Sequence, residues 1–267
     1  MKRSILTGIL ALATGLSGLM AQQPAQKGGQ PQAAPTQPKG PSPKSKEEAA
    51  AVMALQAAVS DPDSLIKAAE DLITKFADTD YKEYALGLEA HAYQSKGDPV
   101  KAEIYAKRAM EINPNNYQME LLLGEVIGNH IGDHDLDRPD KMASATKYFN
   151  DCIENLKTAP KPNPQVSDDQ WNDFKKYQTA EAHNGLGSLA LLDKKWDVAI
   201  SEFKLAVEGD PQDAYNTRLA SAYQSSGQNA EAIAICDKLL ANPQLHPRIK
   251  QVVTNIRALA AAAQNKK

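Results

Sequence analysis

The stretch that decides the fold is residues 182–211, AHNGLGSLALLDKKWDVAISEFKLAVEGDP. It reads as two short helices joined by a turn. Gly187 and Ala190 place small residues on the first helix, where a second helix must approach closely. Phe203 lies on the apolar face of the second helix, and Pro211 ends that helix because proline has no backbone N–H to donate. The pattern predicts an antiparallel helix pair.

Further copies of this helix pair occur along the chain. The second helix of each copy opens with an alanine, and these are Ala102, Ala145, Ala199 and Ala232. Their spacings of 43, 54 and 33 fit a repeat of about 34 residues that carries insertions of about 9 and about 20 residues. Residues 47–76 read as a preceding helix pair, and residues 246–263 as a final amphipathic helix that covers the end of the stack.

In this register the chain resembles the tetratricopeptide repeat family. The resemblance rests on recurring alanine, aromatic and proline positions between about Leu65 and Pro243. No copy has the tryptophan expected early in the first helix, and Lys194 replaces a turn glycine. The resemblance implies an all-α, right-handed solenoid of antiparallel helix pairs with a C-terminal capping helix. It also implies a concave groove, lined by the first helix of each pair, that binds a protein or peptide.

The N-terminus has the features of a secretory signal peptide. Lys2 and Arg3 precede an apolar run that starts at Ile5 and ends at the small residue Ala21. We therefore expect cleavage after Ala21 and export to the periplasm or cell envelope of a bacterium, with a retained membrane anchor as the alternative. Residues 22–45 are rich in proline and glutamine and read as a disordered tether, and residues 46–267 as the helical repeat domain. More loosely, the chain resembles exported bacterial repeat proteins of uncharacterised role.

The charge balance limits the classes of partner. The chain has 30 basic and 33 acidic residues, and loss of Lys2 and Arg3 leaves 28 against 33, a net charge of −5. This balance argues against nucleic acid or an anionic membrane as the main partner, because both require a basic surface. Cys152 and Cys236 occupy core positions of non-adjacent repeats, so we expect free thiols rather than a disulfide.

Neither an enzyme nor a cofactor site is indicated by the motifs. The first insertion has the alternate spacing of a calcium loop at Asp133, Asp135 and Asp137. Arg138 then stands where such a loop needs glycine, and Ser144 where it needs a bidentate glutamate. The Gly-x-Gly at residues 185–187 falls in mid-helix rather than after a strand, which indicates a packing feature and not a phosphate loop. We predict a non-enzymatic chain without a metal or cofactor.

The first helices of the repeats supply the predicted groove. Set in register, its residues are mixed polar side chains: Tyr84, His91, Gln94, Glu125, Asn129, Glu181, Asn184, Ser188, Thr217, Ser221 and Gln224. They contain no lysine or arginine cluster, which departs from the basic clamp that some family members use for a terminal carboxylate. These positions are either a binding groove or plain solvated helix faces.

The second insertion, residues 157–179, lengthens one helix. Ser167 and Gln170 have capping-box spacing, and the helix then runs to about Leu192. Its extension carries three aromatic residues on a broad face, Trp171, Phe174 and Tyr177. They either pack on the helix at residues 142–156 or form an aromatic platform for a ligand. Protein or peptide binding in the groove is the predicted function, and the alternative is a small molecule, glycan or metal bound by the two insertions.

Overall fold

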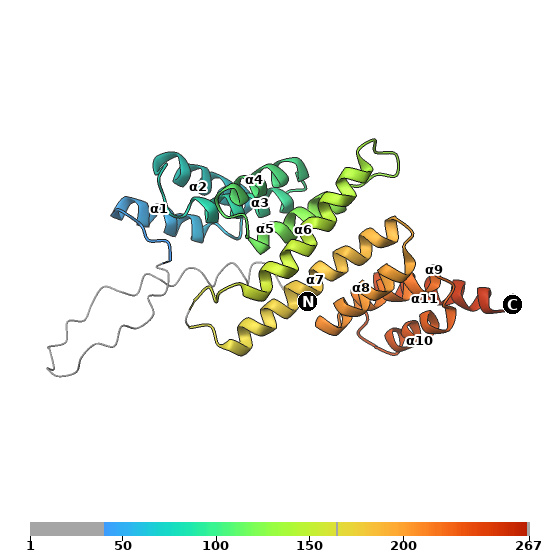
Figure 1. The fold of residues 1–267 in the computed structure, drawn as a ribbon. Helices are drawn as coiled ribbons and strands as arrows, with labels where there is room; N and C mark the ends of the chain where they lie inside the picture. The colour runs from blue at the N-terminus through green and yellow to red at the C-terminus, as the bar shows by residue number, and fades with distance from the viewer. Residues whose placement is uncertain (1–39, 164, 266–267) are drawn as a thin grey trace, which may run out of the picture. The chain divides into compact units, whose positions relative to one another are not determined.

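A computed structural model describes residues 40–163 and 165–265, and all of the regular structure in them is helical (Figure 1). The predicted signal peptide and most of the tether lie outside the described residues. The chain divides into two units, the first reaching Ile112 and including the loop at residues 160–167, and the second holding the remainder. The fold class that the sequence predicted, an all-α stack of antiparallel helix pairs, is confirmed.

The first unit contains two helix pairs. They are α1 (Lys46–Ala57) with α2 (Pro62–Lys75), and α3 (Lys82–Ser95) with α4 (Pro99–Ile112). Asp61 caps α2 by accepting a hydrogen bond from the backbone N–H of Ser64 at 2.9 Å, and Pro62 supplies the fixed φ of the first helical position. The alanines of α4 that face α3 are fully buried, so the two helices approach closely.

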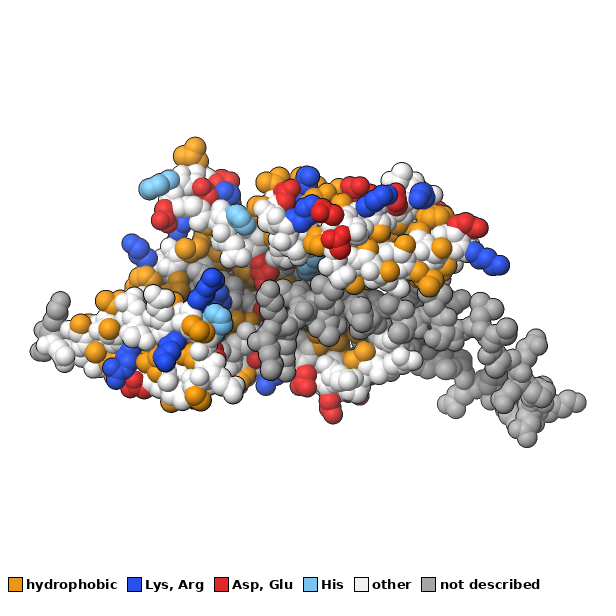
Figure 2. Space-filling model, turned by 180° about the vertical axis from the view of Figure 1, so that it is seen from behind, with side chains coloured by type: hydrophobic (Ala, Val, Ile, Leu, Met, Phe, Trp, Pro, Cys, Tyr) orange, Lys and Arg blue, Asp and Glu red, His pale blue; other side chains and the backbone are white. Residues whose placement is uncertain are grey.

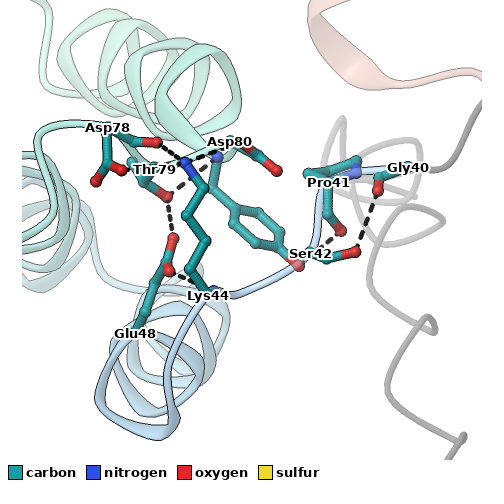
Figure 3. A network of polar contacts seen from close by, with 9 residues as sticks. Gly40, Pro41, Ser42, Lys44, Glu48, Asp78, Thr79 and Asp80 are labelled. Atoms are coloured by element: carbon teal, nitrogen blue, oxygen red, sulfur yellow. Dashed lines mark hydrogen bonds and ion pairs between the residues drawn. The ribbon is translucent and has the colours of Figure 1, made fainter.

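The end of the predicted tether is attached to the first unit (Figure 3). The Lys44 ammonium lies 3.3 Å from carboxylate oxygens of both Asp78 and Asp80, in the loop between α2 and α3. In the same loop the Tyr81 hydroxyl donates a hydrogen bond to the backbone carbonyl of Pro41 at 3.0 Å. Residues 41–44 are therefore fixed against that loop by several polar contacts.

A buried carboxylate lies beneath this attachment. Glu48, on the first turn of α1, is 2% exposed. Its oxygens accept hydrogen bonds from the Thr79 hydroxyl at 2.6 Å and from the Lys44 backbone N–H at 2.5 Å (Figure 3). Because both oxygens are paired, the burial of this charge is compensated, and α1 is tied to the loop that precedes α3.

The second unit contains three helix pairs and a final helix. The pairs are α5 (Tyr117–Gly128) with α6 (Arg138–Thr158), α7 (Asp168–Leu192) with α8 (Trp196–Gly209), and α9 (Asp213–Ser225) with α10 (Asn229–Leu240). The final helix, α11 (Pro247–Gln264), packs against α9 and α10 through Val253, Ile256 and Ala260, as a capping helix does. The predicted start and end of the lengthened helix match α7.

A phenylalanine joins neighbouring pairs of the second unit. Phe149, on α6, is 2% exposed and lies between two glycines. A Cβ atom added to Gly124 on α5 would meet the Phe149 ring at 2.7 Å, and one added to Gly185 on α7 would meet it at 2.2 Å. Gly187 makes the same approach to Phe203, where an added Cβ would lie 2.7 Å from the ring. The Gly-x-Gly is thus a packing feature of α7, as predicted.

Three turns between paired helices share one hydrogen-bond pattern. In the α7–α8 turn the Lys195 N–H donates to the Ala190 carbonyl at 2.9 Å, which requires a left-handed residue between the helices. Gly97 and Gly227 fill that position in two turns, with φ of 73° and 80°. Lys194 fills it in the third with φ 55°, a conformation that costs a residue with a side chain about 1–2 kcal/mol.

Both cysteines belong to the core of the second unit. Cys152 on α6 and Cys236 on α10 are fully buried and carry free thiols. Burial raises the pKa of each thiol, so both stay protonated. Both cysteines therefore occupy core positions, as the repeat register predicts.

Candidate functional site

A group of acidic and tyrosine side chains gathers around Glu181 on α7. The Tyr177 hydroxyl, one turn earlier on the same helix, donates a hydrogen bond to Glu181 Oε1 at 3.1 Å. Burial and, to a smaller extent, the Glu125 carboxylate on α5 raise the pKa of Glu181, the Tyr177 hydrogen bond opposes them, and the resulting pKa is about 7. The Glu181 carboxyl therefore changes charge near neutral pH.

Tyr215, at the start of α9, completes this group. It is 5% exposed, and burial raises its pKa, with the negative charges of Glu181 and Asp210 acting in the same direction. The charges of these groups act on one another's pKa, and the groups belong to α5, α7, α9 and the α8–α9 connection. We call this set the acidic–tyrosine cluster, and its members are Glu125, Tyr177, Glu181, Asp210 and Tyr215.

One arginine borders the acidic–tyrosine cluster. Arg218 Nη1 on α9 donates a hydrogen bond to Asn184 Oδ1 on α7 at 2.5 Å, which links the two helices across their exposed face. The positive charge of Arg218 also opposes the rise in the pKa of Tyr215, so Arg218 acts electrostatically on a member of the cluster. Three carboxyl groups against one guanidinium leave the cluster suited to a cationic group when Glu181 is ionised.

The other predicted groove residues of this unit differ in how available they are. The hydroxyls of Ser188 and Thr217 donate to backbone carbonyls one turn earlier, at 2.8 and 2.7 Å. Asn129 is exposed and lies at the C-terminal cap of α5. Ser221 and Gln224 are half-buried on α9. Glu181, Glu125 and Asn184 are thus the predicted residues that the structure brings together.

Three predicted groove residues belong to the first unit and lie on α3. Tyr84, His91 and Gln94 are all half-buried. Burial lowers the pKa of His91 to about 4, and a hydrogen bond with Gln94 only partly opposes this, so the imidazole is neutral at pH 7. Burial raises the pKa of Tyr84. Their use by a partner stays a prediction.

The predicted aromatic platform is largely an internal stack. Trp171 is 6% exposed, its ring stacks on Phe174 at a centroid distance of 5.2 Å, and its indole N–H donates to the Ala159 carbonyl at 3.3 Å. Tyr117 on α5 packs edge-on against both rings, at 6.4 and 6.3 Å. The stack fastens the extension of α7 to α5 and leaves little of Trp171 for a ligand, whereas Tyr177 belongs to the acidic–tyrosine cluster.

The first insertion uses its carboxylates internally. Asp135 accepts hydrogen bonds from the Gly132 N–H at 2.9 Å and from the Lys141 ammonium at 2.8 Å. Arg138 lies 3.7 Å from Asp133 and donates to the Leu192 carbonyl at 2.9 Å. Among residues 40–163 and 165–265, no group of three or more acidic, histidine or cysteine side chains is placed to hold a metal ion.

Sequence reasoning missed three residues of this region. Tyr215 reads as a core position of α9, Asp210 as a loop residue before Pro211, and Arg218 as a solvated side chain. Tyr215 and Arg218 approach α7 only because α9 packs against it, and Asp210 belongs to the connection between α8 and α9. A usable signal was the repeat register, because Arg218 lies one repeat of 34 residues after Asn184, its hydrogen-bond partner.

Comparisons with known proteins agree on the fold. The profile of the tetratricopeptide repeat family matches residues 84–116, which span α3 and α4. A sequence search of curated proteins finds no match. A thermophilic tetratricopeptide repeat protein of Thermus thermophilus has a similar structure, with a TM-score of 0.50, 17% identity and coverage of 81% of this chain and 98% of that one. For a tetratricopeptide repeat protein of Parabacteroides merdae the values are 0.46, 14%, 83% and 92%.

Proposed function

We propose that this chain, a tetratricopeptide repeat protein by its repeat at residues 84–116 and by its fold, is an exported, non-enzymatic scaffold for a protein or peptide partner. Stacked helical repeats present an extended face of first helices, and that face is the natural place for a partner to lie. In the part of the chain that the structure describes, none of the helices is both long and apolar enough to span a membrane.

The acidic–tyrosine cluster is the observation that carries the proposal. It combines the half-buried carboxyls of Glu125 and Glu181 with the half-buried ring of Tyr177, whereas Tyr215 is buried in the core. Tyrosine supplies contact area at a small entropic cost, and a carboxylate supplies an ion pair for a cation. The partner that fits is a peptide segment with a lysine or arginine next to apolar residues, the cation meeting Glu181 and Glu125.

The charge distribution elsewhere supports partner binding at the acidic–tyrosine cluster rather than at a broad surface that is uniformly positive or uniformly negative. On the face seen in Figure 2, acidic and basic side chains are interspersed among apolar ones. Many of the charged pairs are short-range contacts within one helix, such as Lys107 with Glu103 at 2.6 Å. Such pairs largely neutralise one another and attract neither nucleic acid nor an anionic membrane.

A displayed peptide library tests the binding proposal. Panning against the full chain at pH 8 should enrich peptides with lysine or arginine beside apolar residues, and Glu181→Gln should weaken their binding roughly tenfold because a charge-assisted contact is lost. Glu231→Gln, the same change on an exposed residue of α10, is the control. Enriched peptides that lack a cation, or that bind both variants equally, would contradict the proposal.

Export needs a separate measurement. Expression of the chain from residue 1 in a bacterium, followed by fractionation and N-terminal sequencing, should recover a protein in the envelope fraction that begins at Gln22. An uncleaved chain in the membrane fraction would support a retained anchor instead. An uncleaved chain in the cytoplasmic fraction would contradict export.

A further inference from the structure

An exposed edge of the second unit lies where its helix pairs turn. The connection between α5 and α6 and the turn between α7 and α8 lie at the same end of that unit (Figure 1). Arg138, the first residue of α6, joins them, because its Nη2 donates a hydrogen bond at 2.9 Å to the Leu192 carbonyl at the end of α7. We call this surface the turn edge, and its members are Leu136, Asp140, Leu192, Lys194 and Val198.

Leu136 is presented to solvent by a loop that is held in shape. Its side chain is fully exposed, at 103%. The Arg138 N–H donates to the Asp135 carbonyl at 3.2 Å, which closes a turn with Leu136 at one of its two central positions. The Asp135 carboxylate accepts hydrogen bonds from the Gly132 N–H at 2.9 Å and the Lys141 ammonium at 2.8 Å. An apolar side chain on such a braced loop loses little conformational entropy when another surface covers it.

The neighbouring helix pair adds apolar surface to the turn edge. Leu192, the last residue of α7, is 41% exposed, and Val198, in the first turn of α8, is 49% exposed. Single exposed apolar residues are ordinary on a protein surface, whereas several at one edge mark a place where another protein surface can bind.

The turn edge also carries a cation and an anion that are left unpaired. Lys194 has a positive φ of 55° at a position where the equivalent turns use Gly97 and Gly227, so its side chain is present at a cost in backbone energy. Across residues 40–163 and 165–265, neither the Lys194 ammonium nor the Asp140 carboxylate makes a hydrogen bond or an ion pair. Both charges are therefore available to a partner.

These two charges lie on opposite sides of the start of α6. Arg138 points toward α7, because it reaches the Leu192 carbonyl. Successive helical residues are about 100° apart around the axis, so Asp140 points away from α7. Lys194 lies on the α7 side, in the α7–α8 turn. A two-fold axis that passes between the two charges, beside Leu136, would bring Lys194 of each copy opposite Asp140 of the other.

We propose that this chain forms a homodimer through the turn edge, with the two Leu136 side chains packed at the two-fold axis and two Lys194–Asp140 ion pairs beside them. A second copy fits because the edge is complementary to itself, apolar at its centre with opposite charges on its two sides. A protruding leucine offers no groove to an extended peptide. Residues 133–141 contain four aspartates against one arginine and one lysine, which disfavours an anionic membrane.

The proposed dimer is weak and does not depend on the peptide-binding proposal. Each copy contributes only three large apolar side chains, Leu136, Leu192 and Val198, so the interface belongs among the small, reversible ones. None of these residues belongs to the acidic–tyrosine cluster. Glu181→Gln, which tests peptide binding, should therefore leave dimerisation unchanged.

Sedimentation equilibrium of the full chain from about 10 µM to about 1 mM tests the dimer, and we expect a reversible monomer–dimer equilibrium. Leu136→Asp should weaken dimerisation roughly tenfold or more, because it places a charge at the centre of the interface. Leu259→Asp, the same change on a half-exposed leucine of α11, is the control and should not alter it. Circular dichroism should show both variants folded, since neither leucine is buried.

Charge reversal identifies the two-fold arrangement. Lys194→Glu and Asp140→Lys should each weaken dimerisation roughly five- to tenfold, because both ion pairs become like-charge pairs. An equimolar mixture of these two variants should associate as tightly as the wild type, because each contact again joins opposite charges. Asp197→Lys, on an exposed aspartate of α8 on the same side as Lys194, is the control and should have little effect.

Several outcomes would overturn the proposal. The chain could stay monomeric at about 1 mM, a concentration at which even weak dimers form. Leu136→Asp could associate as the wild type does, or the mixture of charge variants could associate no better than its two components. An equal loss in Leu259→Asp or Asp197→Lys would show that a different surface holds the dimer together.

Discussion

Gly185→Ala should destabilise the second unit, although alanine favours helices. An added Cβ would lie 2.2 Å from Cζ of Phe149, and 2.5 and 2.6 Å from the two ring atoms beside it. Carbon atoms make favourable contact at about 3.5–4.0 Å, so the ring would have to move by more than about 1 Å. It cannot move toward α5, because Gly124 already touches its other side. The strain therefore stays at the α6–α7 contact.

The expected magnitude follows from two opposing effects. Replacing glycine by alanine in a helix interior stabilises the helix by about 1 kcal/mol. Overpacking a close-packed core costs about 1–3 kcal/mol, and the rigid, 2% exposed ring of Phe149 places this site near the upper value. The net loss in free energy of unfolding is therefore about 2 kcal/mol. For a unit of this size, that loss corresponds to a fall in Tm of about 4–8 °C.

Urea unfolding monitored by tryptophan fluorescence isolates the relevant unit. Both tryptophans of the chain, Trp171 and Trp196, belong to α7 and α8. Gly128→Ala is the control, because its Cβ would meet the flexible end of Leu189 as its nearest neighbour, at 3.3 Å. Adding Phe149→Leu should recover about 1 kcal/mol or more of the Gly185→Ala loss relative to additivity. A Gly185→Ala variant as stable as the wild type, or more stable, would refute the packing of Phe149 between α5 and α7.

Three further predictions concern a turn, a buried acid and the binding face. Lys194→Gly should raise the free energy of unfolding in urea by about 0.5–1 kcal/mol, because glycine accepts the positive φ that Gly97 and Gly227 already use in the equivalent turns. Glu89 on α3 is 1% exposed, and burial raises its pKa to about 8 from an ordinary value of 4.5. The folded chain then keeps a proton that the unfolded chain has lost, so stability should fall as pH rises from about 5 to 8. Glu89→Gln should remove this fall and stabilise the chain by on the order of 2–4 kcal/mol at pH 8, as measured by circular dichroism, and an unchanged pH profile would disprove it. Because the pKa of Glu181 is about 7, binding of a lysine-containing peptide should weaken as pH falls from 8 to 6, and Glu181→Gln should abolish that dependence in a calorimetric titration.

The repeat pattern predicted most of the fold because it reports local packing. The alanines at positions 102, 145, 199 and 232 are fully buried, as the repeat pattern requires. Ala102, Ala199 and Ala232 lie in the first turn of their helices, whereas α6 begins at Arg138, so Ala145 does not open its helix as the pattern predicted. Ser167 predicted the start of α7, since a cap depends on residues within one turn. Lys194 did not obscure the α7–α8 turn, because the hydrogen bonds of the turn tolerate it at a cost in backbone energy.

The candidate site was only partly predictable, because it depends on contacts between helices far apart in sequence. Glu181 could be assigned to the first-helix face, but its raised pKa needs Glu125 beside it and burial around it. The helical periodicity of a sequence does not reveal whether a side-chain hydroxyl is available to a partner. The Ser188 hydroxyl is not, because it donates a hydrogen bond to a backbone carbonyl of its own helix. The role of Trp171 depended on Tyr117, 54 residues earlier, and sequence spacing alone left its two interpretations open.

The packing of the Phe149 ring between Gly124 and Gly185 limits how this chain can be truncated or duplicated. Gly124, on one side of the ring, belongs to the same helix pair as Phe149, and Gly185, on the other side, belongs to the next pair along the chain. A fragment that stops after α6 would keep the aromatic ring and lose half of its enclosure. If only α5 and α6 were duplicated, a second copy of α5 would follow the first α6 in place of α7. The glycine of that helix, Gly124, is in a different register from Gly185, so it would not meet the first copy of the Phe149 ring in the same way. A fragment that keeps both sides of the Phe149 ring covered must therefore contain two consecutive pairs, residues 113–209.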